Sequence, residues 1–269
     1  MGRTSRGTVQ LIPGIGRRSF NPASLFANSE VGAWYDPSDL STLFQDAAGT
    51  TPVTASGQTV GLHLDKSGNG NHRYQASADS RPQYVVDGAL RYLLYDGIDD
   101  FLETNAVNFT GTDKMTVWWG GRKLSDAAIG MVTEFGINAG FINNSFWLVG
   151  GVSTGPAPGY SFRSRGTTPR TAEVSVGYPA PISNVVTGLG SITPPVVTLR
   201  VDGVQVANLT DDQGTGNYGN HKLFFGRRGG TSLPFNGHEH QTIIRGAETD
   251  LATIEKTELF VRGKVGITW

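Results

Sequence analysis

Short runs of β-branched and aromatic residues, separated by Gly, Asn, Asp and Pro, recur through most of the 269-residue chain. Such runs predict strands, and many short strands joined by turns predict a sandwich or jelly roll. Asp202-Gly203 lies between two alternating runs and predicts a type I′ hairpin. The strands predicted from the pattern are Leu90–Tyr95, Met115–Arg122, Gly130–Phe135, Ser145–Val149, Gly159–Arg163, Val196–Val201, Val204–Asn208, Lys222–Gly226 and Gln241–Arg245.

One segment near the end of the chain has a helical pattern. Asp250 can cap the first turn, apolar residues recur on one face as far as Val261, and Gly263 is expected to end the helix. Glu258 precedes Arg262 by one turn, a spacing that favours an ion pair. We therefore predict a helix from Asp250 to about Val261, covering a sheet edge or an open end of the sandwich.

Residues 150–196 are rich in Gly, Pro, Ser and Thr. Strand patterns continue on both sides, so this composition does not indicate a boundary between domains. We predict that these residues form long surface loops within one domain, where recognition often takes place.

The first thirty residues differ from the rest, because they are basic, have no acid before Glu30, and contain Pro and Gly that interrupt any period. Two interpretations stay open: a flexible tail, or an arm that orders against a neighbouring subunit. Nucleic-acid contact is the weaker alternative, because no aromatic residues are interleaved with the arginines. We divide the chain into an extended arm, 1–30, and a sandwich, 31–269. The arginines assigned to assembly are Arg3, Arg6, Arg17 and Arg18.

The composition narrows the class of protein. Charged residues are 17% and Gly numbers 37, which fits a turn-rich β protein. The net charge of −1 gives no overall attraction to nucleic acid or membrane. No apolar run is long enough to cross a bilayer, and the start is not a convincing secretory signal. The absence of Cys excludes disulfides, Cys-zinc sites and a Cys nucleophile.

Several motifs then occur in a definite order. They are "DKSGNGNH" at 65–72, "YDGIDDFL" at 95–102, "MTVWW" at 115–119, "LRVDG" at 199–203, and "PFNG" with "TIIRG" at 234–246. The ordered set resembles the concanavalin A-like lectin/glucanase superfamily in its laminin G-like branch. Together with "AWYDPSDLSTLFQD" at 33–46, "GRKLSDAA" at 121–128 and the terminal "RGAETDLATIEKTELFVRGKVGI", it is similar to members encoded in bacteriophage and prophage structural gene clusters. The resemblance implies an all-β, antiparallel jelly-roll sandwich with an extended N-terminal arm and one short C-terminal helix.

The two oxygen-rich turns invite a calcium interpretation. Calcium takes six to eight oxygen ligands, and calcium sites occur in the superfamily without being universal. The alternative is that Asn and Gly occupy left-handed turn positions while Asp bonds its own backbone. Turns alone are favoured over a bound ion. The candidate calcium ligands are Asp65, Asn69, Asp99 and Asp100.

Hydrolytic and transition-metal chemistry find little support. A glycosidase needs two carboxyl groups at a defined separation, and Glu134 and Glu173 each stand without a second acid nearby. His238 and His240 would share one strand face, but two ligands bind a metal poorly. We interpret them as a surface or interface pair, and we expect the charged Glu239 between them to contact water or a neighbouring chain.

Sugar binding is the remaining chemistry. Aromatic faces pack on the C–H patches of sugars, and Asn, Asp and Arg bond their hydroxyls. Adjacent residues of a strand point to opposite faces, so one tryptophan of the pair at 118–119 is expected in the core. All of these aromatics could equally be core anchors. The candidates for carbohydrate contact are Trp118, Trp119, Trp147, Tyr160 and Tyr218.

We therefore expect a non-enzymatic virion structural protein, such as a capsid decoration, fibre or tail component. Its arm is expected to bind other virion proteins, and its sandwich to present a lectin-like surface to host glycans, strengthened by avidity in a homo-oligomer. No cofactor other than possible calcium, no membrane and no specific nucleic acid are expected as partners. The alternatives are a bacterial glycan-binding adhesion module and a glycan hydrolase or depolymerase.

Overall fold

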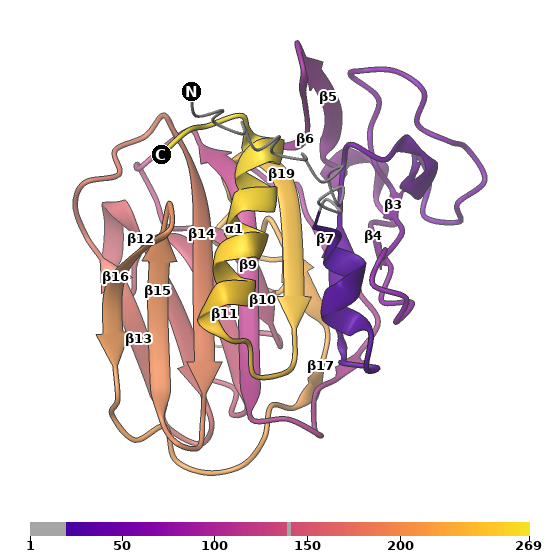
Figure 1. Cartoon of the computed structure of the whole chain (residues 1–269). Helices are drawn as coiled ribbons and strands as arrows, with labels where there is room; N and C mark the ends of the chain where they lie inside the picture. Colours follow the sequence, from indigo (N-terminus) through magenta and orange to yellow (C-terminus); the bar gives the residue numbers. More distant parts are fainter. Residues whose placement is uncertain (1–19, 139–140) are drawn as a thin grey trace, which may run out of the picture.

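The computed structural model describes residues 20–138 and 141–269, which form two antiparallel sheets packed face to face with one helix outside them (Figure 1). Sheet A has, in spatial order, β16 (Val204–Leu209), β15 (Val196–Val201), β14 (Ile182–Ser191), β9 (Lys114–Lys123), β19 (Asn236–Arg245), β6 (Leu90–Asp96) and β5 (Gln83–Asp87), and β1 (Gly32–Tyr35) also pairs with β19.

Sheet B lies behind it in Figure 1. It has, in order, β13 (Pro169–Val174), β12 (Gly155–Arg165), β11 (Ser145–Val152), β10 (Gly130–Phe135), β18 (Leu223–Phe225), β7 (Leu102–Thr104), β4 (Arg73–Tyr74), β3 (Leu62–His63) and β2 (Leu43–Phe44). The shorter elements are the pair β8 (Val107–Asn108) and β17 (Asn220–His221), and the 3-10 helices η1 (Pro22–Phe26), η2 (Leu40–Thr42) and η3 (Ala78–Ser80).

The antiparallel jelly-roll sandwich predicted from the sequence is confirmed, and every predicted strand overlaps an observed one. The hairpin at Asp202-Gly203 is also confirmed, because both residues have positive φ, 50° and 80°. The prediction of long loops over residues 150–196 is wrong, because β12, β13 and β14 occupy most of this segment. β14 even lies inside sheet A, between β15 and β9.

The main core lies between the two sheets. Alternate residues of each strand point into it, so that Phe146 and Leu148 of β11 face Trp119 and Val186 of sheet A. Phe135 and Phe146 stack with ring centroids 5.2 Å apart. Large aromatic rings fill this space and bury more area than any other side chains, so the sandwich depends on them.

A charged network crosses this apolar core. Arg73 of sheet B reaches Glu239 of sheet A through two nitrogens, at 3.0 and 2.8 Å, and both side chains are almost fully buried. Glu239 also accepts hydrogen bonds from Tyr95 (3.0 Å) and Thr242 (2.8 Å), and Arg73 contacts His63 (3.0 Å). Burial, reinforced by the charge of Arg73, holds the pKa of His63 well below its usual value. The expectation that Glu239 contacts water or another chain is therefore wrong.

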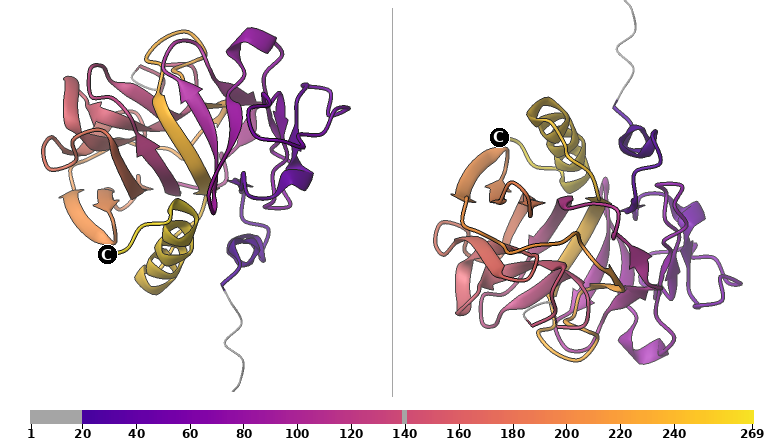
Figure 2. Two further views of the ribbon diagram at one scale, coloured as in Figure 1. Left: turned by 90° about the horizontal axis from the view of Figure 1, so that it is seen from above. Right: turned by 90° about the horizontal axis from the view of Figure 1, so that it is seen from below.

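A second core lies on the outer face of sheet A, beneath α1 (Leu251–Val265) and η1 (Figure 2). Trp118 and Ile243 point outward from the sheet here and pack against Ile254 and Val261 of the helix. The helix thus covers β9, β14 and β19, in the interior of sheet A. The expected position over an edge or an open end is wrong.

The ends of the helix are set by its caps. Asp250 accepts the N–H of Thr253 (2.8 Å), as predicted. The helix continues past Gly263 and ends at Gly266, whose φ of 74° is the left-handed conformation typical of a helix stop. The expected pairing of Glu258 with Arg262 is also wrong, because Glu258 is buried and pairs with Arg200 of β15 at 2.8 and 3.0 Å.

Residues 20–30 belong to the packed structure. Leu25 and Phe26 of η1 are buried in the second core, and Arg245 donates to the carbonyl of Leu25 (2.8 Å). The expected boundary at residue 30 therefore falls inside a packed segment. The four arginines assigned to the arm, Arg3, Arg6, Arg17 and Arg18, lie outside the described residues.

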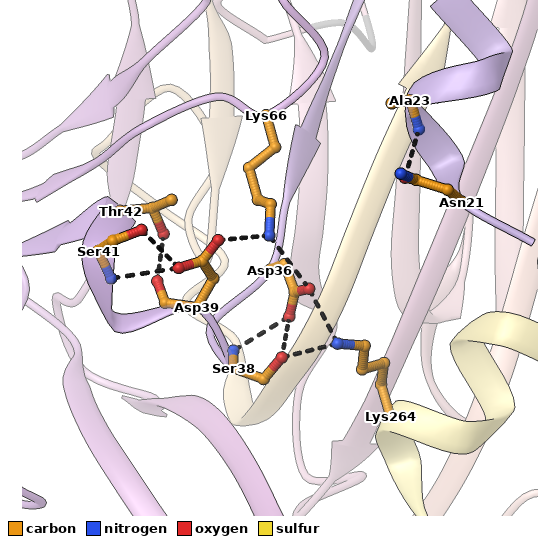
Figure 3. Close-up of polar contacts among 9 residues, drawn as sticks. All are labelled: Asn21, Ala23, Asp36, Ser38, Asp39, Ser41, Thr42, Lys66 and Lys264. Atoms are coloured by element: carbon orange, nitrogen blue, oxygen red, sulfur yellow. Dashed lines mark hydrogen bonds and ion pairs between the residues drawn. The ribbon is translucent and has the colours of Figure 1, made fainter. Parts of the chain in front are cut away.

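A cluster of charged residues fastens the end of α1 to the segment after β1 (Figure 3). Asp36 bonds Lys264 of the helix (2.9 Å) and the hydroxyl of Ser38 (2.6 Å), and Lys66 pairs with Asp39 (2.6 Å).

Within the described part of the chain, no helix is both long and apolar enough to cross a membrane.

Candidate functional site

The first oxygen-rich turn, residues 65–72, is saturated by its own chain. The carboxylate of Asp65 accepts the N–H groups of Trp34 and Ser67 (both 2.8 Å) and of Asn71 (3.0 Å), and also the Ser67 hydroxyl (2.7 Å). Asn69 points its amide N–H₂ at a backbone carbonyl (3.0 Å). Four donors use the acceptor capacity of the Asp65 carboxylate. The turn therefore fastens β1, as in the favoured interpretation, and its bonds leave no support for the alternative calcium role of Asp65 and Asn69.

The second turn does bring acids together. Asp96, Asp99 and Asp100 have carboxylate oxygens within 4.8 Å of one another, and no other metal-type cluster occurs in residues 20–138 and 141–269. Burial, followed by the repulsion of Asp96, raises the pKa of Asp100 to about 7. Asp100 still accepts the N–H of Asp96 (3.0 Å). Of the four candidate calcium ligands, Asp99 and Asp100 therefore belong to this cluster, whereas Asp65 and Asn69 belong to the other turn.

Replacing Asp100 by Asn is expected to stabilise the protein above neutral pH. The raised pKa means that the folded state holds a proton that the unfolded state has lost, so stability falls as pH rises from about 4 to about 7. Asn cannot lose a proton in this range, and its side-chain oxygen can still accept the N–H of Asp96. The free energy of unfolding should therefore rise by about 1–2 kcal/mol at about pH 8 and change little near pH 4. Thermal melts across this range measure the difference. Equal destabilisation at both pH values would contradict it.

Calcium provides the control for this experiment. If the three carboxylates bind calcium, millimolar calcium raises the melting temperature of the wild type above neutral pH and leaves that of Asp100→Asn almost unchanged. If they form only a turn, calcium changes neither protein.

The histidine pair is on the outer face of sheet A. His238 stacks on Tyr92 with centroids 4.0 Å apart, and His240 is almost fully buried. Burial lowers the pKa of each ring to about 4, with the nearby Arg122 adding to the effect on His238. Both rings are neutral at physiological pH and pack as aromatic groups. The expectation of a surface position is therefore wrong for His240, which is buried.

None of the five predicted sugar-binding aromatics has an exposed ring. Trp119, Tyr160 and Tyr218 are part of the main core, and Trp118 is part of the second core. Trp147 points outward from sheet B but is only 2% exposed. The expectation of direct stacking on these rings is wrong, because each is used to bury area within a layer.

Three loops instead form a polar hollow whose lining includes His221 of β17, the strand labelled at the lower right of Figure 1. They are residues 108–112 after β8, residues 141–144 before β11, and residues 214–219 before β17. The hollow has a volume of about 670 Å³. Its lining consists of Thr110, Ile142, Asn143, Asn144, Gly216, Asn217, Tyr218, Gly219 and His221.

Hydrogen bonds between the loops hold the hollow in shape. Asn217 donates its side-chain amide to the carbonyl of Thr110 (2.6 Å), and Asn144 donates its own to the carbonyl of Asn217. The N–H of Gly219 returns to the carbonyl of Asn144 (2.8 Å). The loops are therefore fixed before any ligand binds, which reduces the entropy that binding must overcome.

The lining groups match the hydroxyls of a sugar. Asn143 accepts from Arg165 at its carbonyl (3.1 Å), and its N–H₂ has no hydrogen-bond partner among the described residues. The side-chain oxygens of Asn144 and Asn217 likewise receive no hydrogen bond from the described part of the chain. The hollow thus contains both donors and acceptors that no described residue uses.

An exposed aromatic residue directly precedes one of the lining residues in the chain. Phe141, which precedes the lining residue Ile142, is 79% exposed. A phenyl face in water is suited to the C–H face of a sugar ring. Sequence reasoning missed this residue and the asparagines. The only signal was the cluster of Asn in "INNS" and "GNYGN", which is also typical of turns.

The outer face of sheet B adjoins this hollow. Trp147 lies beneath the guanidinium of Arg163, whose carbon is 4.7 Å from the ring centroid. Glu134 on the neighbouring strand is fully buried, where it accepts the N–H of Gly229 (3.0 Å) and pairs with Arg228 (3.4 Å). Arg163 is thus supported from below by Trp147, while Arg228 neutralises Glu134.

No protein-family model matches the chain, and no characterised protein matches its sequence. Solved structures match its fold. A botulinum neurotoxin type C structure and the binding domain of botulinum neurotoxin DC in complex with SialylT each match with a TM-score of 0.55 and 10% identity, over 74% of this chain. The chain spans 48% of each toxin structure. The Ruminococcus gnavus IT-sialidase CBM40 matches with a TM-score of 0.44 and 18% identity, over 55% of this chain and 83% of that one.

At this identity the toxin matches show the fold alone. Together with the sheet order they show that the chain is an antiparallel jelly-roll sandwich. The laminin G-like branch and the bacteriophage origin stay predictions.

Proposed function

We propose that the chain is a non-enzymatic glycan-binding protein and that the polar hollow takes the sugar. The observation that carries the proposal is the set of preformed loops, whose amide groups line a hollow of about 670 Å³ and one of which also contains the exposed Phe141. Preformed concave sites with a few convergent polar groups are the usual places for small ligands. The carbohydrate-binding proteins among the fold matches are consistent with this proposal.

The acids of sheet B argue against the rival glycosidase hypothesis. Glu134 on β10 and Glu173 on β13 are separated by two strands, so their positions are about 14 Å apart in strand spacing. Glu103 on β7 lies in register with Glu134 across β18, about 10 Å away in strand spacing, and it is paired with Lys222 (2.6 Å). Glycosidase pairs lie within about 9.5 Å. Glu134 is also buried against Arg228 and Gly229. The geometry of this face therefore favours binding over hydrolysis.

A glycan array followed by calorimetry tests the site. Phe141→Ala and Asn143→Ala should each weaken binding of the best glycan about tenfold, because each removes one contact worth about 1 kcal/mol or slightly more. Ile98→Ala is the matched control, since Ile98 is 70% exposed on a different turn. Its affinity should equal that of the wild type. A glycan whose affinity is the same in all four proteins would place the site elsewhere.

We further propose that this module is part of a bacteriophage virion, as a capsid decoration, fibre or tail component with several copies per particle. The ordered motifs of the sequence support the proposal, and the weak affinity expected of a shallow hollow would gain from avidity. The segment before residue 20 would bind other virion proteins. Mass spectrometry of purified particles checks the proposal, and particles that lack the chain would contradict it.

A further inference from the structure

Three arginines lie side by side next to the hollow. Arg163 and Arg165 are two residues apart on β12, and Arg163 pairs in register with the outward-facing Trp147, so both point out of sheet B. Arg228 comes from the connection between β18 and β19 and reaches the same face at Glu134. The three side chains are neither fully buried nor fully exposed.

Their positive charge is only partly balanced. The acids carried by β10 to β13 are Glu134 and Glu173. Glu134 is enclosed and neutralises Arg228, and Glu173 accepts the N–H of Ser153 (2.9 Å). Burial lowers the pKa of Arg163, and repulsion by Arg228 and Arg165 lowers it further, more than Glu173 restores it. Like charges close to Arg163 cost stability, and such a group is typical of a binding site for the opposite charge.

The guanidinium of Arg163 is positioned to receive a ligand. Its Nε donates to the hydroxyl of Thr171 (2.8 Å), and its plane lies over the ring of Trp147. Its two terminal nitrogens have no hydrogen-bond partner among the described residues. This arrangement fixes the side chain and leaves the pair of donors that binds a carboxylate through two parallel hydrogen bonds.

A hydrogen bond connects this group of arginines to the hollow. Arg165 donates from its Nε to the side-chain oxygen of Asn143, which lines the hollow (3.1 Å). Arg165 thus adjoins the hollow through Asn143, and Arg163 is the next outward-facing residue of the same strand. The distance is that of one sugar unit, because alternate residues of a strand lie about 7 Å apart.

We propose that the glycan bound at the hollow is acidic, and that the carboxylate of a uronic or nonulosonic sugar docks on Arg163 and Arg165. The inference rests on the function proposed above and adds the chemical class of the ligand. Arg163 receives the carboxylate through its two free nitrogens, and Arg165 links the charged part of the site to the amides that bind the hydroxyls.

The test compares matched pairs of glycans. Sialyllactose is measured beside lactose, and a uronic acid oligosaccharide beside its carboxyl-reduced form, by calorimetry at low and high salt. The acidic member of at least one pair should bind about tenfold tighter or more, as expected for a charge-assisted bond, and salt should reduce the difference. Arg163→Gln should remove the preference and leave binding of the neutral member unchanged. Arg165→Gln should also remove the preference, and because it loses the bond to Asn143 it should weaken binding of both members.

Arg122→Gln is the matched control, because it removes the same charge from an exposed position on sheet A, the opposite face. Thermal melts show whether Arg163→Gln has disturbed the packing of Trp147. If it has, the loss of the preference for the acidic glycan is measured with Arg165→Gln instead. Neutral and acidic members that bind equally, or a preference that survives both arginine variants, would overturn the inference while leaving the proposed function standing. Failure of every glycan to bind would reject the proposed function itself.

Discussion

Replacing Glu239 by Gln is expected to lower the free energy of unfolding by about 3–5 kcal/mol, because the change leaves the buried charge of Arg73 without its partner. Arg73 has no exposed surface and sits between the rings of Tyr35 and Phe225, 4.3 and 4.7 Å from their centroids. Solvent cannot reach it. Glu239 is the acid that bonds it, through two separate contacts.

Chemical denaturation of the two proteins measures the effect, with Glu255→Gln as the control. Glu255 lies on the exposed side of α1, and its replacement should change stability by less than about 0.5 kcal/mol. A double change, Arg73→Met with Glu239→Leu, should recover much of the loss, because removing both charges also removes their cost of burial. If Glu239→Gln were as stable as the wild type, water would have to reach Arg73, and the two sheets would not be closed as described.

The inward position of Glu239 illustrates what the sequence could and could not predict. The spacing of His238 and His240 placed them on one strand face, and Glu239 on the other, which is correct. The pattern did not say which of the two faces is the inner one. The partner that makes burial of a carboxylate tolerable is Arg73, 166 residues away. Contacts this distant depend on the order of strands in the sheets, which single runs of residues do not determine.

The prediction of loops at 150–196 was wrong for a different reason. Gly188 and Gly190 lie within β14 (Ile182–Ser191), where the composition suggested a loop. A Cβ at Gly188 would lie 2.1 Å from the ring of Phe162, so the glycine makes room for an aromatic side chain of the opposite sheet. Glycine within a strand often marks such a close approach. A strand of this kind cannot be told from a loop by its residue types.

The candidate site could not be predicted from the sequence for the same two reasons: its residue types are not distinctive, and its parts are far apart in the chain. Its asparagines, at 143, 144 and 217, are common turn residues and come from loops about seventy residues apart. The tryptophans and tyrosines are more distinctive residue types, but the five proposed as sugar-binding residues are buried. The fold was predictable because it depends on repeated local patterns. The site was not, because it depends on where a few loops meet.

Replacing Val261 by Asp should lower the free energy of unfolding by about 4 kcal/mol or more, because it places an unpaired charge in the second core. Val261 has no exposed surface, and a Cβ added to Gly120 of β9 would lie 2.4 Å from it, so helix and sheet are in close contact. Leu259→Asp is the matched control. Leu259 is 49% exposed on the same helix, and its change should cost less than about 0.5 kcal/mol.

Tryptophan fluorescence and far-UV circular dichroism, followed through denaturation, separate two ways in which Val261→Asp could act. If the helix supports the sheet, both signals shift together to lower denaturant. If the helix signal is lost while the sandwich unfolds at its original midpoint, the second core is dispensable and the expectation is wrong. The result also bears on ligand binding. Sheet A is covered on both faces, which is why Trp118 and Trp119 are both buried although they point in opposite directions. A helix that detached readily would return Trp118 to the surface, and the search for the sugar site would have to include that face.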